Sequence, residues 1–200
     1  ETLYREFLSR IKETDLSVPV RRHDYYYYSR TEQGRDYPIF CRKHGDLEAP
    51  EEVILDVNVL AKGHDYYDIG TVAVSPDHKL LAYGEDTDGS ETYRLRVKSL
   101  ASGELLGIDL DNTAADIEWC LDSRSFYYTV LDATKRPYRV LRHHLDGRPE
   151  EQVLEEPDEA FFARLSHSKD RRQIYISLGS HVTSEEYFLD AADPGARPTL

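Results

Sequence analysis

The chain has 200 residues, 40% of them hydrophobic and 11% aromatic, which suits one domain or two small ones with a buried core. Its formal net charge of −13 argues against nucleic acid and an anionic membrane surface as partners, since both are bound by clustered Lys and Arg. No run of 18 apolar residues is present, so no membrane-spanning helix is expected.

The chain lacks the features of a natural start. It begins at Glu1, contains no Met and shows no signal peptide. We therefore expect a segment of a longer protein.

Residues 2–14, TLYREFLSRIKET, predict an amphipathic helix. Leu3, Phe7 and Ile11 recur every four residues, as on one face of a helix. Acid-before-base pairs four residues apart, Glu1 with Arg5 and Glu6 with Arg10, support its exposed face. We expect residues 1–16 to be this N-terminal helix, the end of a longer lead segment.

From Ser17 onward the hydrophobic period is two, and short apolar runs alternate with turns that carry Gly or Pro. Four sets of strands are predicted. The first is VPVRRHD, YYYYSRTE, YPIFCRKH and EEVILDVN. The second is TVAVSP, LLAYGED, TYRLRVKSL and GELLGIDL. The third is DIEWCLD, SFYYTVLD, YRVLRHHL and EQVLEEP. The fourth is AFFARLSH, QIYISLGS and EEYFLDAAD, and it runs out at GARPTL, where an outer strand is expected.

A repeat links the second and third sets. Four residues recur 45 positions later, each in the same place of its set: Asp77, Tyr83, Tyr93 and Arg94 become Asp122, Tyr128, Tyr138 and Arg139. Strand-sized runs at a fixed period in the 40s are typical of β-propeller blades. The predicted fold class is mainly β: about four blades of four-stranded antiparallel sheet over residues 17–200, the last incomplete, after a short helix. A sandwich of two sheets is the alternative, because it also uses short strands at this spacing.

The fourth set departs from the repeat. Asp170 and Tyr187 lie 17 residues apart, whereas the corresponding Asp and Tyr of the two preceding sets lie 16 apart. One inserted loop residue explains this difference.

The repeated residues are expected to have structural roles. Asp77 and Asp122 fall in tight turns between first and second strands, where an Asp side chain accepts hydrogen bonds from local backbone N–H groups. The repeated Tyr residues are expected to pack across strands or between sheets. Trp119 takes the place of Val74 on an inner strand and is expected in the core.

Cys41 and Cys120 have no CxxC or Cys/His spacing suited to zinc. Two unpaired cysteines fit a reducing cytosol, and we expect a cytoplasmic protein. A disulfide between them stays open as the alternative.

The sequence contains no G-x-S-x-G string, the turn that exposes the nucleophile of an α/β-hydrolase. Ser90, Ser102 and Ser180 each adjoin one Gly and are predicted to be hairpin or loop residues. His143 and His144 are neighbours on a strand and point to opposite faces, so they cannot share one metal ion without a bulge. The pairs His23 with Asp24 and His64 with Asp65 are expected at the surface or in turns. We predict no catalytic, cofactor-binding or metal-binding residue in this chain, and no cofactor.

Several strings resemble a known family when taken together. They are LYREFLSRIKETDLSVPVR, GRDYPIFCR, EEVILDVNVLAKGHDYYDIG, VSPDHKLLAYGEDTDGSETYRLRV, ATKRPYRVLRHHL and ISLGSHVTSEEYFLD. From Leu3 to about Pro194 the chain is similar to the propeller of the oligopeptidase B (protease II) branch of the prolyl oligopeptidase family of serine peptidases. The resemblance implies a seven-bladed propeller that caps an α/β-hydrolase domain with a Ser, Asp and His triad. It also implies cleavage of short peptides after Arg or Lys, with folded proteins spared because the propeller restricts entry.

Three turns between second and third strands are candidate ligand-facing segments, because loops at domain interfaces tend to build ligand sites: Asp86 to Glu91, Asp132 to Arg136 and Gly179 to Glu185. They are expected on the same side as the entry of the chain into each inner strand. In related prolyl peptidases, side chains near the positions of Ala114 and Ser180 line the substrate cavity, but the residue types here differ. Long-range attraction of cationic peptides and ordinary solvated turn acids are the two interpretations of Asp86, Asp88, Glu185 and Glu186.

Two other functions stay open: a non-enzymatic propeller that serves as a binding scaffold, and the propeller cap of a prolyl, dipeptidyl or acylaminoacyl peptidase. An unclosed set of blades exposes faces that are meant to pack, so we expect the isolated chain to self-associate. Partners expected through the parent protein are its catalytic domain and short basic peptides. The chain alone is expected to be inactive.

Overall fold

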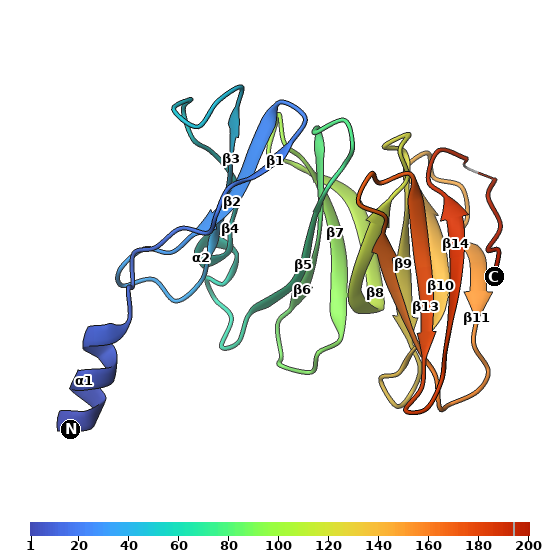
Figure 1. Cartoon of the computed structure of the whole chain (residues 1–200). Helices are drawn as coiled ribbons and strands as arrows, with labels where there is room; N and C mark the ends of the chain where they lie inside the picture. The colour runs from blue at the N-terminus through green and yellow to red at the C-terminus, as the bar shows by residue number, and fades with distance from the viewer. Residues whose placement is uncertain (194) are drawn as a thin grey trace. The chain divides into compact units, whose positions relative to one another are not determined.

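The computed structural model describes residues 1–193 and 195–200, so Pro194, where the resemblance ends, lies outside the described residues. The described residues form fourteen strands in three antiparallel sheets of four, seven and three strands, with two short helices (Figure 1). The mainly β fold of propeller type is thereby confirmed. The chain divides into two compact units, residues 1–65 and 66–200, which we describe in turn.

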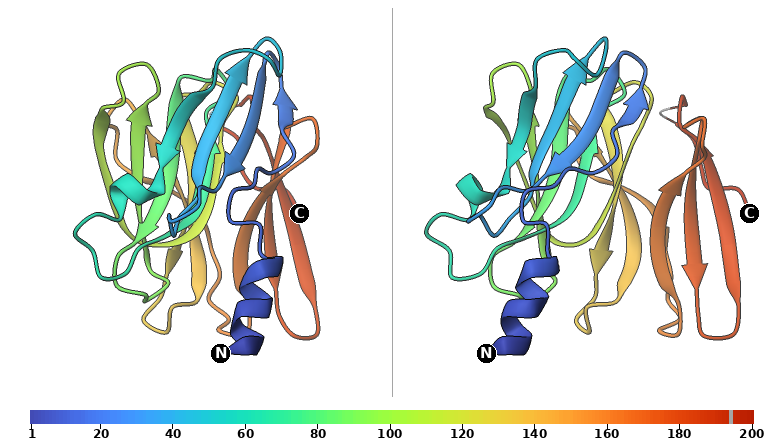
Figure 2. Two further views of the ribbon diagram at one scale, coloured as in Figure 1. Left: turned by 90° about the vertical axis from the view of Figure 1, so that its left-hand side faces the viewer. Right: turned by 60° about the vertical axis from the view of Figure 1, so that its left-hand side comes forward.

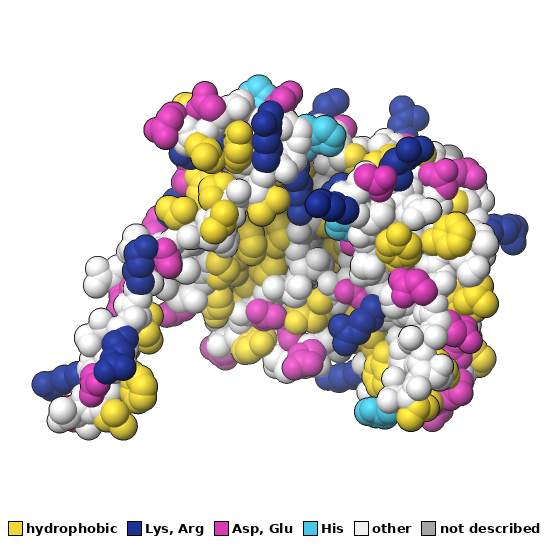
Figure 3. Space-filling view, in the orientation of Figure 1, with side chains coloured by type: hydrophobic (Ala, Val, Ile, Leu, Met, Phe, Trp, Pro, Cys, Tyr) yellow, Lys and Arg dark blue, Asp and Glu magenta, His cyan; other side chains and the backbone are white. Residues whose placement is uncertain are grey.

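The first unit begins with a helix that nothing in the described chain covers. α1 runs over Thr2–Arg10, and Ile11 already has extended backbone angles, so the predicted end at residue 14 is wrong. Its apolar side chains are all solvent-exposed, with Phe7 58% accessible (Figure 3). The two predicted acid–base pairs form, Arg5 with Glu1 and Arg10 with Glu6. A nine-residue helix without tertiary packing has only local interactions to hold it, which explains its early end.

The sheet of the first unit has the strand order β1-β2-β3-β4. Its strands are β1 (Val20–Arg22), β2 (Tyr25–Arg30), β3 (Ile39–His44) and β4 (Glu52–Asp56). The predicted fourth strand extended to Asn58, but the chain turns into a short helix, α2 (Val57–Leu60). The reason is local: the Asp56 carboxylate accepts the backbone N–H of Asn58 at 3.0 Å and so caps α2.

In the second unit, two of the three blades are joined in one seven-stranded sheet, ordered β11-β10-β9-β8-β7-β6-β5. Its strands are β5 (Asp68–Val74), β6 (Leu80–Asp86), β7 (Tyr93–Ser99), β8 (Leu105–Trp119), β9 (Ser125–Leu131), β10 (Pro137–His144) and β11 (Glu151–Glu155). Two strands were predicted where β8 runs as one. Its first half pairs with β7, its second half pairs with β9, and Thr113 pairs with both neighbours. One strand therefore closes one blade and opens the next.

The third sheet consists of β12 (Phe162–His167), β13 (Gln173–Gly179) and β14 (Ser184–Asp190), in that order. Thr199 forms an isolated bridge with Phe188, through two backbone hydrogen bonds of 2.9 and 3.1 Å. At the predicted outer strand, GARPTL, the described residues form only this isolated bridge rather than a strand. The sheet stands at the C-terminal end of the second unit (Figure 2).

The turn between first and second strands repeats in all three blades of the second unit. Asp77, Asp122 and Asp170 each accept the backbone N–H two residues ahead, at 3.2, 2.8 and 3.1 Å. One residue after each Asp, the backbone takes a positive φ between 56° and 61°. The predicted structural role of these Asp residues is confirmed.

The loop explanation for the fourth set is wrong. In the two preceding blades, Tyr83 pairs with Arg96 and Tyr128 pairs with Leu141. Each Tyr lies six positions after its turn Asp, and each partner lies 19 positions after that Asp. In the third sheet Ile176 pairs with Tyr187, which lies 17 positions after Asp170. The hairpin is therefore two residues shorter than the others, and Tyr187 is not the counterpart of Tyr93.

Among the described residues, two apolar cores pack within the second unit. One lies between its first two blades and includes Ala82, Leu95, Trp119 and Phe126. The other joins β9 and β10 to the third sheet through residues such as Tyr127 and Ile176. Trp119 is 6% exposed and its indole N–H donates to the Ala73 carbonyl at 3.0 Å, so its predicted place in the core is confirmed.

Both cysteines are buried and free. Burial raises the pKa of Cys41 to about 12 and raises that of Cys120 as well, because a thiolate loses hydration there. Neither thiol is therefore activated for nucleophilic chemistry.

Candidate functional site

The predicted ligand-facing turns of the second unit share one side of it. We call this side the turn face; it comprises the turns 86–91, 132–136 and 179–185 and the segments 66–68 and 156–161, which lead into inner strands.

The β6–β7 turn closes around a buried carboxylate. Asp86 is 1% exposed and accepts the backbone N–H groups of Asp88, Gly89 and Glu91 at 2.8 to 3.0 Å. Burial raises the pKa of Asp86, but these donors outweigh it and hold the pKa below its ordinary value. The ionised Asp86 carboxylate therefore stabilises the turn by accepting its backbone N–H groups.

Hydrogen bonds join the segment that leads into β5 to the two strands that flank this turn, β6 and β7. Tyr67 is 3% exposed and its hydroxyl donates to Glu85 at 2.5 Å. The Tyr93 hydroxyl donates to Asp68 at 3.1 Å. Burial and the Glu85 carboxylate both raise the pKa of Tyr67, so the phenol stays protonated and serves as a donor.

The β9–β10 turn repeats this arrangement with a cation added. The Asp132 carboxylate accepts from the hydroxyl and N–H of Thr134 and from the N–H and Nε of Arg136. The Thr134 hydroxyl is the largest of the causes that lower the pKa of Asp132.

Arg136 joins the β9–β10 turn to the entry into the third sheet. Its side chain is 7% exposed and donates to the carbonyls of Asp158 at 3.0 Å and Phe161 at 2.8 Å. The Lys135 ammonium reaches the Ser90 carbonyl in the neighbouring turn. The prediction that these turns lie on the side where the chain enters the inner strands is confirmed. Sequence reasoning did not single out Arg136, although Asp132 four residues earlier is the pairing signal it could have used.

The β13–β14 turn carries Ser180. Its hydroxyl accepts the N–H of Thr183 at 3.1 Å and donates to the Thr183 carbonyl at 3.0 Å. A cavity of about 300 Å³ adjoins this turn. It is lined by Phe162, Arg164, Ser177, Gly179, Ser180 and His181. Ala114 lies within β8 and lines neither this cavity nor the second one described below.

The other predicted turn residues also have local partners. The Ser90 hydroxyl accepts the N–H of Thr92 and the Ser102 hydroxyl accepts the N–H of Glu104, both at 3.3 Å. These serines, like Ser180, are turn residues as predicted. Three of the acids are bonded locally too: Asp88 by the Ser90 N–H, Glu185 by the Tyr187 hydroxyl and Glu186 by the Ser177 hydroxyl. The structural interpretation of the turn acids is therefore favoured over a peptide-attracting one.

The neighbouring His143 and His144 face different partners, as predicted for a strand. The Nδ1 of His143 lies 2.7 Å from Glu150, whereas the Nε2 of His144 lies 3.6 Å from Glu151. His23 has a positive φ of 54° in the β1–β2 turn. Among the described residues, no group of three or more His, Cys, Asp and Glu side chains could hold a metal ion. None of the helices described is long and apolar enough to span a membrane.

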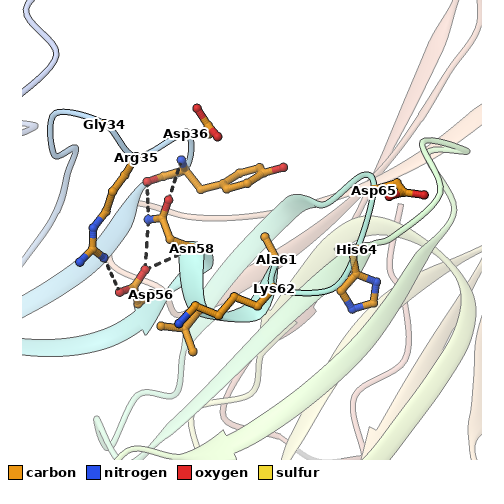
Figure 4. Close-up of a pocket in the computed structure, with 11 residues that line it drawn as sticks. Gly34, Arg35, Asp36, Asp56, Asn58, Ala61, Lys62, His64 and Asp65 are labelled. Carbon is orange, nitrogen blue, oxygen red and sulfur yellow. Dashed lines mark hydrogen bonds and ion pairs between the residues drawn. The ribbon is translucent and has the colours of Figure 1, made fainter.

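The first unit has a larger, open cavity of about 600 Å³ beside its β2–β3 turn (Figure 4). It is lined by Gly34, Arg35, Asp36, Tyr37, Asp56, Asn58, Val59, Ala61, Lys62, His64 and Asp65. The Asn58 amide bonds both the N–H and the carbonyl of Tyr37, at 3.0 and 2.8 Å, and Arg35 pairs with Asp56 at 3.0 Å. The predicted surface pair His64 and Asp65 lies at its rim. Charged side chains of both signs therefore line the cavity.

Comparison with known proteins places these features in a family. Residues 1–200 match the family described as "Prolyl oligopeptidase, N-terminal beta-propeller domain". A relative from Pseudoxanthomonas mexicana, "Dipeptidyl aminopeptidase BI", is 37% identical over the whole chain, which corresponds to 30% of that relative. "Protease 2" of Moraxella lacunata is 34% identical over 97% of the chain and 29% of its own length. The chain thus spans about 30% of the length of these curated relatives.

Solved structures agree with this match. Oligopeptidase B from Leishmania major superposes with a TM-score of 0.90 at 30% identity, over 100% of this chain and 29% of that one. Oligopeptidase B from Trypanosoma brucei, in a closed form with covalently bound antipain, gives a TM-score of 0.85 at 30% identity with the same coverage.

Proposed function

The chain belongs to the prolyl oligopeptidase family through its N-terminal β-propeller domain, and from this premise we propose that it is the substrate-gating part of a serine oligopeptidase. The parent enzyme cleaves short peptides after Arg or Lys in the cytoplasm. The observation that carries the proposal is the superposition on oligopeptidase B over the whole of the present chain, with a TM-score of 0.90.

The catalytic machinery belongs, in this proposal, to the rest of the parent chain. Acyl transfer needs a serine exposed on a sharp turn beside oxyanion donors. Ser90, Ser102 and Ser180 have hydroxyls engaged in their own turns. Residues 1–200 alone therefore do not hydrolyse peptides, and residues 17–200 supply blades one to four of the ring.

The turn face gives the propeller a rigid surface toward its catalytic domain. Arg136 and Lys135 fasten one turn to the next inner strand and to the neighbouring turn, as described above. Because buried hydrogen bonds fix the turn face, it admits an extended peptide and excludes a folded protein by size.

The experiment compares the parent enzyme with residues 1–200 on peptide amides that end in Arg or Lys, on a length series of peptides, and on a folded protein. We expect turnover of short substrates by the parent only. A parent in which the serine of its G-x-S-x-G string is replaced by Ala controls for contaminating peptidases. Sustained hydrolysis by purified residues 1–200 would overturn the assignment.

Gating is tested separately from chemistry with Arg136→Gln in the parent. The change removes the bonds to Asp158 and Phe161 while leaving the distant catalytic residues untouched. We expect faster cleavage of long peptides and an unchanged kcat/KM for a dipeptide amide, with circular dichroism as the folding control. Equal effects on both substrates would argue against a gate.

A second activity, release of dipeptides from free N-termini, is favoured by the 37% identity to the relative named "Dipeptidyl aminopeptidase BI". Substrates with free and blocked N-termini distinguish the two. An endopeptidase cleaves both forms, whereas a dipeptidyl aminopeptidase requires the free amine.

A further inference from the structure

The third sheet meets the blade before it along the contact between residues 113–119 of β8 and the strand β12, which we call the inner seam. Two carboxylates of β8 cross this seam. Asp116 accepts the Leu165 N–H at 3.3 Å, and both carboxylate oxygens of Glu118 lie 2.8 Å from Nδ1 of His167. The inner seam is therefore held in part by side chains that can gain or lose a proton.

The contact between the two blades of the seven-stranded sheet is built differently. There the Trp119 indole N–H donates to the Ala73 carbonyl, and the Ser123 hydroxyl accepts the Asp77 N–H, each at 3.0 Å. Backbone amides, hydroxyls and indoles keep their protonation state at ordinary pH. These bonds therefore do not respond to pH, in contrast to those of the inner seam.

The bond between Glu118 and His167 changes character with pH. Histidine is the side chain whose charge ordinarily changes between about pH 5 and 8. A neutral ring donates to Glu118 only when its single proton is on Nδ1, whereas the imidazolium always carries that proton and adds a charge opposite to the carboxylate. The side chains of Glu118 and His167 are 16% and 32% exposed, so solvent screens their attraction only in part.

The charged and titratable groups nearest to this pair keep their state over the same pH range. Tyr127 of β9 lies in register with Glu118, and Arg142 of β10 lies in register with Tyr127. Lys169 and Asp170 follow His167 in the β12–β13 turn. At ordinary pKa values, Arg, Lys and Asp side chains stay charged and Tyr stays neutral between about pH 5 and 8.

Two further groups on the seam need separate controls. Desolvation raises the pKa of Asp116, which Arg164 of β12 only partly opposes, so acidification removes a buried charge there and also tightens the seam. His144 lies on the same face of β10 as Arg142, two residues away, but it stands beside Glu151 of the outer strand at 3.6 Å.

We propose that Glu118 and His167 form a pH-dependent latch, which holds the third sheet on the preceding blade more tightly when His167 is protonated. The latch lies at the end of β12 remote from the turn face, because segment 156–161 enters β12 from the turn face and His167 ends the strand. Raising the pH through the range in which histidine loses its proton therefore loosens the inner seam from that end.

The test is hydrogen–deuterium exchange of residues 1–200 at about pH 5.5 and about pH 8, which bracket the titration of histidine. Protection factors are compared, because they divide each rate by the intrinsic rate at the same pH. The chain carries Asp116→Asn, which keeps an oxygen for the Leu165 N–H and removes the second titrating carboxyl. We expect the β12 amides to be about threefold to fivefold better protected at the lower pH, the effect of a partly shielded ion pair.

His167→Gln and Glu118→Gln, each added to that chain, should abolish the difference, since glutamine keeps a hydrogen-bonding group but does not titrate. His143→Gln is the matched control. It removes a histidine whose Nδ1 lies 2.7 Å from Glu150, but both residues belong to one blade, so the difference at β12 should persist.

Circular dichroism confirms folding of each variant, and Glu118→Gln decides the question if His167→Gln unfolds the chain. Equal protection of β12 at the two pH values in the Asp116→Asn chain overturns the proposal. So does a difference that survives both glutamine variants, because His144 or another group then carries it. The measurement needs no peptidase activity, so the proposal stands or fails apart from the proposed function.

Discussion

Gly70 illustrates how one residue sets the spacing of two blades. A Cβ atom at this position would lie 2.5 Å from Cε1 of the Tyr93 ring and 2.6 Å from the Ala115 Cβ. The ring cannot move aside easily, because its hydroxyl is bonded to Asp68. We expect Gly70→Ala to lower the free energy of unfolding by about 1–3 kcal/mol through overpacking.

The measurement is urea unfolding, with Gly179→Ala as the control. A Cβ at Gly179 meets no atom within 4 Å, and its backbone is an ordinary strand. The control should change stability by less than about 0.5 kcal/mol. Equal effects of the two substitutions would show that the blades adjust to an added methyl group.

Asp116 gives a pH-dependent prediction. Desolvation raises its pKa above the ordinary value of about 3.9, and the Leu165 N–H and Arg164 only partly oppose the rise. A raised pKa means that the folded state holds the proton more tightly than the unfolded state. The contribution of Asp116 to the free energy of unfolding is therefore fully present below about pH 3.9, and it is lost as the pH rises through the folded-state pKa.

Asp116→Asn removes this dependence and keeps an oxygen for the Leu165 N–H. We expect the variant to gain stability over wild type as the pH rises above about 3.9, by about 1.4 kcal/mol per unit of pKa shift, and the gain to level off above the raised pKa. Urea unfolding at a series of pH values measures it. A difference that is constant from pH 3 to pH 7 would show that ionisation of Asp116 is not responsible.

Residues whose partners are local were predictable from the sequence, and those with distant partners were not. The roles of Asp77 and Asp122 follow from two-residue hydrogen bonds within a turn. Arg136 has Phe161 as a partner, 25 residues away, so its role depends on how the β9–β10 turn meets the next blade. The cavity beside Asn58 was missed for the same reason, because Tyr37 lies 21 residues before it.

At the scale of elements, the strand β8 shows what the alternation of apolar residues can and cannot predict. The runs GELLGIDL and DIEWCLD gave two strands at the correct places, but their union into one strand through Thr113 depends on pairing with both β7 and β9. The hairpin of the third sheet shows the same limit. Spacing of side chains indicated an insertion, whereas the backbone register shows two residues fewer.

Asn112 is the residue at which β8 passes from one blade to the next. Its φ is +56°, and its side-chain amide donates to the Leu131 carbonyl at 2.7 Å. We expect Asn112→Val to cost about 2–3 kcal/mol, because a β-branched residue is strained at positive φ and the hydrogen bond is lost.

Asn112→Gly separates the two causes, since Gly accepts positive φ but cannot bond Leu131. It should cost about 1 kcal/mol, the value of one hydrogen bond. Thermal and urea unfolding provide both numbers. A Val variant no less stable than the Gly variant would show that the backbone relaxes at this position.

At the scale of the whole molecule, charge and packing act in opposite directions. The chain has 38 acidic and 25 basic side chains, so the folded state concentrates like charges. Exposed ion pairs such as Arg5 with Glu1 and Arg148 with Asp146 contribute little to offset this repulsion. Cooperation between blades instead comes from buried bonds, such as that of Trp119 to Ala73.

Salt should therefore stabilise the chain. Raising NaCl from 20 to 300 mM shortens the electrostatic screening length from roughly double its value at physiological salt to well below that value. The change weakens repulsion between distant acidic side chains more than it weakens close ion pairs. A gain of about 1 kcal/mol corresponds to a rise in Tm of about 2–4 °C. Scanning fluorimetry measures the change in Tm at about 1 µM protein, a concentration low enough to limit self-association.

The control is the same salt titration near pH 5.0, the isoelectric point of the sequence. The effect of salt should vanish there, because the net charge does. A Tm that falls with salt near pH 7 would mean that close ion pairs, rather than net charge, govern the electrostatics of this fold.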